Sequence, residues 1–156
     1  MTVIEGLAIF GGAMALAGGL AGSAMGIGNA ASSGTATLSE DSGQLRNVIV
    51  LASLPMTQSF YGLIVLIIIL TVVMPNLATA GMGAGLAVLG IGIMGGFAQV
   101  FSAIFQGSVC AAGIALLPKT RGRILTLAMM LAVFVELIGV LGLVFSIMAL
   151  SLLGLM

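Results

Sequence analysis

Four long apolar runs, separated by short polar segments, make up almost the whole chain. They cover roughly residues 4–31, 48–74, 83–117 and 124–155. A helix that crosses the hydrocarbon core of a bilayer needs about 20 consecutive apolar residues, so each run is long enough to span a membrane. The pattern therefore predicts an all-α membrane protein with four transmembrane helices.

The composition agrees with this prediction and excludes other classes of protein. Hydrophobic residues make up 61% and charged residues only 5% of the 156 positions, whereas an ordinary soluble domain has about 25% charged residues. The net charge is zero and there is no basic tract, so we expect no nucleic-acid partner. Cys110 is the single cysteine and the chain has no histidine, so neither a disulfide framework nor a thiol metal site is available.

The basic residues predict how the chain is oriented in the membrane. All four lie in two connections: Arg46 in residues 39–47, and Lys119, Arg121 and Arg123 in residues 118–123. Basic connections tend to stay on the cytoplasmic side. We therefore expect these two connections to be cytoplasmic, and both termini and residues 75–81 to lie outside, in the cell membrane.

The second half of the chain repeats the first. We interpret the repeat as two tandem, duplicated helical hairpins, residues 1–75 and 76–156, with the same orientation in the membrane. Under this alignment Glu136 falls opposite Met56, so only the second hairpin has an acid at this position. The matched pairs include Gly6 with Gly85, Ser23 with Ser102 and Gly28 with Gly107 at a shift of 79 residues, and Gly62 with Gly142 at a shift of 80.

Glycine distinguishes the first and third apolar runs from the second and fourth. In the first run Gly18, Gly22 and Gly26 recur every four residues, a spacing that lets helix backbones approach closely within a membrane. The second and fourth runs are instead rich in Ile, Leu, Val and Met. This favours a ring of protomers with the glycine-rich helices inside, and leaves open a compact four-helix monomer with one glycine seam.

Glu136 is the one charged residue in the middle of an apolar run. A carboxylate at that depth in a bilayer is costly and is retained mainly where it has a function. Counted inward from the cytoplasmic connections, Thr57, Gln58 and Gln106 lie within about one helical turn of the same depth. Tyr61 follows Gln58 at i+3 and so lies on the same helix face.

The oxygen atoms of this polar cluster indicate what it binds. Carboxylate, amide and hydroxyl oxygens suit a hard cation, and one negative charge is neutralised by one monovalent ion. Pro55, which cannot donate a backbone hydrogen bond, would leave further carbonyl oxygen available nearby. Na+ and a proton are the candidates, and the number of oxygens favours Na+.

Three segments carry a resemblance to a known family. They are "LPMTQSFYG" (54–62), "FQGSVCAAGI" (105–114) and "FVELIGVLGL" (134–143). The chain resembles the membrane rotor proteolipid of V-type and archaeal-type rotary ATPases, the double-hairpin proteolipid known as K or c, in its sodium-translocating branch. The resemblance covers nearly the whole chain.

The resemblance implies a role for each residue of the cluster. The ligands of one Na+ would be the Glu136 carboxylate, the Gln58 and Gln106 amide oxygens, the Thr57 hydroxyl and the Leu54 carbonyl. Tyr61 would hydrogen-bond to Glu136 and hold it closed. These assignments stand as implied by the resemblance.

The resemblance also implies the partners of the chain. Identical protomers would form a ring that turns against a static membrane partner with a cationic side chain, and would contact the central stalk of the ATPase. The chain would have no catalytic residues, and another subunit would hydrolyse ATP. The alternatives are a proton-translocating rotor and a self-contained cation channel or exchanger.

Overall fold

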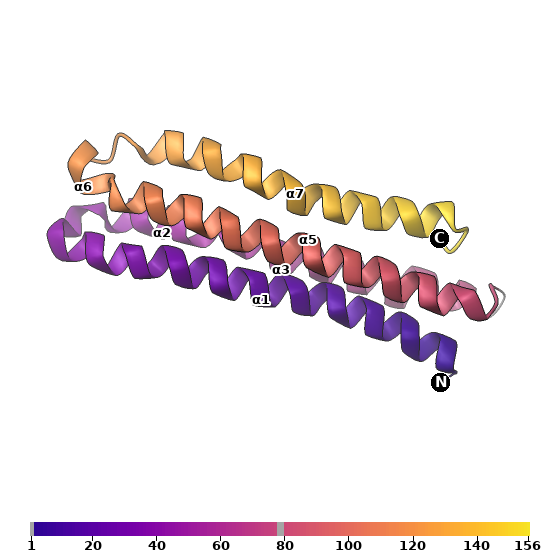
Figure 1. Cartoon of the computed structure of the whole chain (residues 1–156). Coiled ribbons are helices and arrows are strands. Elements are labelled where there is room, and N and C mark those ends of the chain that lie inside the picture. Colours follow the sequence, from indigo (N-terminus) through magenta and orange to yellow (C-terminus); the bar gives the residue numbers. More distant parts are fainter. Residues whose placement is uncertain (1, 78–79) are drawn as a thin grey trace.

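The computed structural model describes residues 2–77 and 80–156, and it folds them into four long helical segments that run side by side (Figure 1). Each segment is long and apolar enough to cross a membrane. The predicted all-α architecture with four membrane-spanning helices is therefore confirmed. The elements are α1 (Val3–Glu40), η1 (Ser42–Gln44), α2 (Leu45–Ser53), η2 (Leu54–Met56), α3 (Thr57–Ile68), η3 (Ile69–Val73), α4 (Met74–Leu77), α5 (Met82–Ala115), α6 (Leu117–Thr120) and α7 (Leu125–Leu152).

The first connection is much shorter than the predicted segment of residues 39–47. Helix α1 continues to Glu40, and the 3-10 turn η1 begins after Asp41. Two polar contacts explain the difference. The Thr37 hydroxyl donates to the Ile114 carbonyl of α5 at 3.0 Å, and the Asp41 carboxylate accepts from the Gly43 N–H at 3.0 Å. Polar residues that suggested a loop therefore extend the helix instead.

The second span is one continuous path with two irregular turns, each close to a proline. Pro55 lies in the 3-10 turn η2, where the Leu54 N–H bonds to the Leu51 carbonyl and the Thr57 N–H to the Leu54 carbonyl. The wider π turn η3 comes just before Pro75. Because a proline ring clashes with the carbonyl four residues earlier, helices depart from regular geometry at such places.

Helices α1 and α5 pack closely and in parallel along a glycine seam (Figure 1). A Cβ on Gly18 would collide with the backbone of Gly96, and a Cβ on Gly107 with the backbone of Gly26. Glycine therefore allows the two backbones to touch, as expected for membrane helices that pack through small residues. Positions related by the sequence repeat lie next to each other across this seam.

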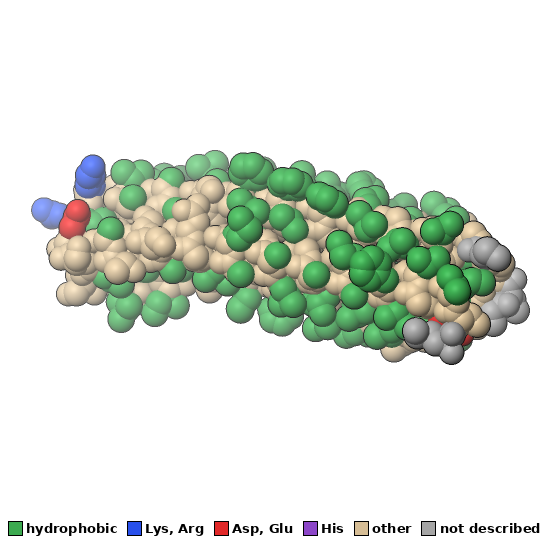
Figure 2. All heavy atoms as spheres, turned by 60° about the horizontal axis from the view of Figure 1, so that its bottom comes forward, with side chains coloured by type: hydrophobic (Ala, Val, Ile, Leu, Met, Phe, Trp, Pro, Cys, Tyr) green, Lys and Arg blue, Asp and Glu red, His purple; other side chains and the backbone are tan. Residues whose placement is uncertain are grey.

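The outer surface of the bundle is apolar along its length. Figure 2 shows hydrophobic side chains over the whole face in view, with Lys and Arg side chains gathered at the end that contains α6. Both termini lie at the opposite end (Figure 1). A surface of this kind is suited to contact with lipid rather than water, and the chain is a multi-pass integral membrane protein.

A buried polar layer lies between two apolar clusters in the interior. One cluster includes Val65, Ile69 and Leu150, and the other includes Leu51, Cys110 and Ala132. Side chains of α3 and α5 form the polar layer between them. These side chains are Gln58, Gln99, Ser102 and Gln106, each at most 1% exposed.

Candidate ion-binding site

The predicted site residues come from three helices that meet at the polar layer. Thr57, Gln58 and Tyr61 occupy the first two turns of α3, directly after the 3-10 turn at Pro55. Gln106 lies on α5 and Glu136 near the middle of α7. Helical periodicity turns Gln106 into the bundle, where it is 0% exposed.

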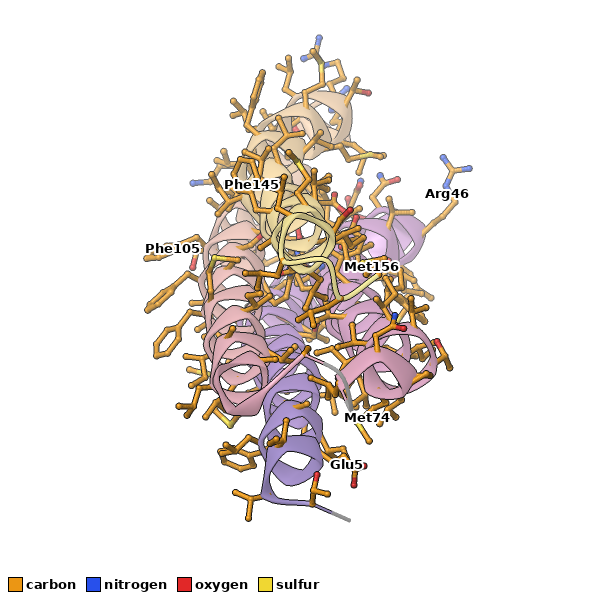
Figure 3. The ribbon with its side chains drawn as sticks, turned by 90° about the vertical axis from the view of Figure 1, so that its right-hand side faces the viewer. Glu5, Arg46, Met74, Phe105, Phe145 and Met156 are labelled. Atoms are coloured by element: carbon orange, nitrogen blue, oxygen red, sulfur yellow. The ribbon has the colours of Figure 1, made fainter. Side chains whose placement is uncertain are left out.

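The residue before Gln106 emphasises this orientation. Phe105 points away from the bundle (Figure 3) and is 58% exposed. Consecutive residues of one helix are about 100° apart around its axis, so α5 presents an aromatic surface outward and an amide inward at the same level. The inward side of α5 thus supplies polar groups to the interior without disturbing the apolar exterior.

Each oxygen of the Glu136 carboxylate accepts a hydrogen bond from a different helix. The Tyr61 hydroxyl donates to Oε1 at 2.9 Å, and the Gln106 amide Nε2 donates to Oε2 at 3.2 Å. Hydrogen bonds to an ionised group are stronger than those between neutral groups. These two bonds fix the partly buried carboxylate between α3 and α5.

The remaining predicted residues continue the same hydrogen-bonded chain. Gln58 Nε2 donates to Gln106 Oε1 at 2.9 Å. The Thr57 hydroxyl lies 3.2 Å from both Gln58 Oε1 and the Leu54 carbonyl oxygen. Three neutral oxygens, from Leu54, Thr57 and Gln58, therefore lie together at the start of α3.

All six predicted residues are thus brought together. In residues 2–77 and 80–156, no three His, Cys, Asp or Glu side chains cluster where they could hold a metal. Glu136 is instead surrounded by neutral oxygen and nitrogen atoms. A donor set with one negative charge suits a monovalent cation better than a divalent one. That these residues bind an ion stays a prediction.

Two polar residues of the layer were missed by the sequence analysis. Ser102 accepts a hydrogen bond from Gln58 Nε2 at 3.0 Å and donates one to the Val135 carbonyl at 3.0 Å. Gln99 Nε2 donates to the Gly139 carbonyl at 2.9 Å. Their spacing was the available signal, since Gln99, Ser102 and Gln106 follow one another at i, i+3 and i+7 on one face of α5.

Fold and site together define a class of protein. The chain is a double-hairpin membrane proteolipid with a carboxylate held in the middle of its last span. It belongs to the family of the ATP synthase C-type proteolipid subunit, whose model matches the chain twice, over residues 3–69 and 89–149. The two matches agree with two tandem hairpins, while the boundary between residues 75 and 76 remains a prediction.

Curated relatives support the same family. The chain is 40% identical over 136 residues to A-type ATP synthase subunit K of Methanocaldococcus jannaschii, which covers 83% of this chain and 60% of that protein. It is 31% identical over 125 residues to V-type sodium ATPase subunit K of Enterococcus hirae, covering 80% of this chain and 78% of that protein. The match thus spans about three fifths of the first relative. The predicted resemblance to rotor proteolipids is confirmed.

Proposed function

We propose that the chain is the ion-translocating rotor-ring subunit of a V/A-type ATPase, and that each protomer binds one Na+ at Glu136. The observation that carries the proposal is the carboxylate itself, held within the membrane by Tyr61 and Gln106. The names of the two relatives, an A-type ATP synthase subunit and a V-type sodium ATPase subunit, support it. Coupling of ion flow to rotation follows from this assignment.

The proposed ligands need one rearrangement to hold Na+. The oxygens of Leu54, Thr57 and Gln58 already lie together, whereas Gln106 directs its amide nitrogen at Glu136. A half-turn of the Gln106 amide would replace that nitrogen by an oxygen facing the carboxylate. The cation would then lie between Glu136, Gln106 and the three oxygens of α3. Tyr61 would keep its bond to the other carboxylate oxygen.

Charge explains why such a site can carry an ion through lipid. With Na+ bound, Glu136 and its guest form a neutral pair that can face hydrocarbon at modest cost. Without the cation, a carboxylate facing lipid is strongly unfavourable. The ion-free state would therefore be confined to the contact with a static membrane subunit, where a cationic side chain could pair with Glu136. Ions would enter and leave at that contact.

The remaining parts of the proposal concern assembly. Identical protomers would form a ring with α1 and α5 inside, where the glycine seam allows close packing. The basic connections near Arg46 and Arg121 would face the cytoplasm and a central-stalk subunit. Both termini would lie outside, in the cell membrane. The chain would not hydrolyse ATP, and a partner subunit would supply that activity.

Carbodiimide labelling of the purified protein tests the assignment. The reagent modifies protonated buried carboxyl groups, so we expect it to label Glu136 and Na+ to protect this residue, with choline at equal ionic strength as the control. Glu40, exposed at the end of α1, is an internal reference that Na+ should not protect. Labelling that ignores Na+ would favour a proton rotor.

Sedimentation and electron microscopy test the ring. We expect the mildly solubilised protein to sediment as an oligomer and to give an annular projection. Single chains under every mild condition would refute the ring. Na+ flux through liposomes that contain only the purified chain would favour the channel or exchanger instead.

A further inference from the structure

Gln99 is a buried polar residue that the proposed ion ligands do not include. Its side chain is 0% exposed, and its Nε2 donates to the Gly139 carbonyl at 2.9 Å. Its Oε1 has no hydrogen-bond partner among the residues that the structure describes. Leaving a buried acceptor unsatisfied costs about 1–3 kcal/mol. A chain with so few polar residues inside its spans has reason to avoid this cost unless the amide has a role.

The amide of Gln99 occupies the space that a side chain at position 139 would need. A Cβ on Gly139 would lie 2.8 Å from Gln99 Oε1, 3.0 Å from Ser102 Oγ and 3.3 Å from Gln58 Cγ. Gly139 follows Glu136 at i+3, one turn along α7. Gln99 and Gly139 are therefore a matched pair at a junction of α3, α5 and α7, directly beside the ion site.

The first hairpin lacks this arrangement at the equivalent place. There Gly62 packs directly on the backbone of α1, whereas its repeat counterpart, Gly142, faces the side chains of Ala98 and Gln99. Leu20, the counterpart of Gln99 at the shift of 79 residues, is exposed. An amide between the two helices therefore occurs in the hairpin that carries the acid and is replaced in the other by backbone contact.

Two side chains of α5 hold the backbone of α7 on both sides of Glu136. Ser102 donates to the Val135 carbonyl, one residue before the acid, and Gln99 donates to the Gly139 carbonyl, three residues after it. Ser102 also accepts the hydrogen bond from Gln58. The positions of the carboxylate and of one proposed amide ligand therefore depend on the same small group of contacts.

We propose that Gln99 is a positioning residue that sets the cation affinity of the site. It acts through Gly139 and the adjoining Ser102, by fixing where Glu136 and Gln58 lie, and it does not touch the ion. This inference rests on the proposed cation site at Glu136. A side chain of similar volume without the amide should keep the helices apart but lose the bond to Gly139.

Tyr61 provides a reporter for the test. It is the only tyrosine and the chain has no tryptophan, so the intrinsic emission of the purified ring comes from a phenol bonded to Glu136. Donation of the hydroxyl proton to a carboxylate quenches tyrosine emission. A change in the position or charge of Glu136 should therefore change the emission, and titration with NaCl gives the Na+ concentration for half of the change.

We expect Gln99→Met to raise this half-change concentration at least tenfold and to alter the emission in Na+-free buffer, while the ring stays assembled. Ser108→Ala, which removes another α5 polar group that bonds to α1, should leave both unchanged. A half-change concentration within twofold of that of the unaltered protein would overturn the inference. If the unaltered protein shows no response to Na+, the sodium assignment fails. Equal Na+-free emission of Gln99→Met and the parent would then separately overturn the role of Gln99.

A second set of variants covers the case in which Gln99→Met does not assemble. Gly139→Ala should impair Na+ binding because its methyl group meets the Gln99 amide. Adding Gln99→Ala removes that collision, so the double variant should assemble and bind Na+ more tightly than Gly139→Ala. Equal effects of Gly139→Ala with Gln99 or Ala at position 99 would overturn the proposed pairing.

Discussion

Tyr61→Phe isolates a single hydrogen bond of the proposed site. The substitution keeps the aromatic ring and removes the hydroxyl that lies 2.9 Å from Glu136 Oε1. Hydrogen bonds to charged groups contribute about 1.5–3 kcal/mol. Because Na+ would share the charge of the carboxylate, we take the lower value, about 1.5 kcal/mol. Since about 1.4 kcal/mol corresponds to a factor of ten, Na+ should bind about tenfold more weakly.

Protection of Glu136 from carbodiimide measures this change. The Na+ concentration that halves the labelling rate should rise about tenfold in Tyr61→Phe, while the ring remains assembled. Phe60→Leu is the matched control, because Phe60 is the neighbouring aromatic residue and is 54% exposed. A midpoint for Tyr61→Phe within twofold of that of the unaltered protein would refute the reasoning that the hydroxyl holds Glu136 in its closed position.

Two further predictions concern a ligand and the packing. Gln106→Leu should abolish protection of Glu136 by Na+ in the same assay, because it removes an amide that contacts the carboxylate; unchanged protection would exclude Gln106 as a ligand. Gly18→Ala should lower the thermal stability of the protein, because its methyl group meets the backbone of Gly96, whereas Gly28→Ala meets nothing within 4 Å. Overpacking of this kind typically costs about 1–3 kcal/mol, and equal melting temperatures of the two variants would contradict the glycine seam.

Much of the fold could be predicted because membrane spans depend on length and hydrophobicity. The four spans and the duplicated hairpins follow from apolar runs and repeated glycines. The ends of the helices were harder to predict, since hydroxyl side chains are compatible with either a loop or a helix. Thr37, close to the predicted loop, bonds across to α5 and continues α1. Only the tertiary contact decides between these outcomes.

The site could be predicted in part for a similar reason. Depth in the membrane can be counted along a helix, so the sequence alone places Gln58, Gln106 and Glu136 at one level. Gln99 lies about two turns from Gln106 and was missed, because depth alone does not tell which part of α7 it meets. The bond from Gln99 to the Gly139 backbone also leaves no signal in residue type at the acceptor.

ATP-driven Na+ uptake by vesicles that contain the complete ATPase tests the central claim most directly. Glu136→Gln removes the negative charge and nearly preserves the shape of the side chain, and Glu40→Gln is the control at an exposed acid. We expect uptake to stop in Glu136→Gln and to continue in Glu40→Gln. Undiminished uptake in Glu136→Gln would contradict the account.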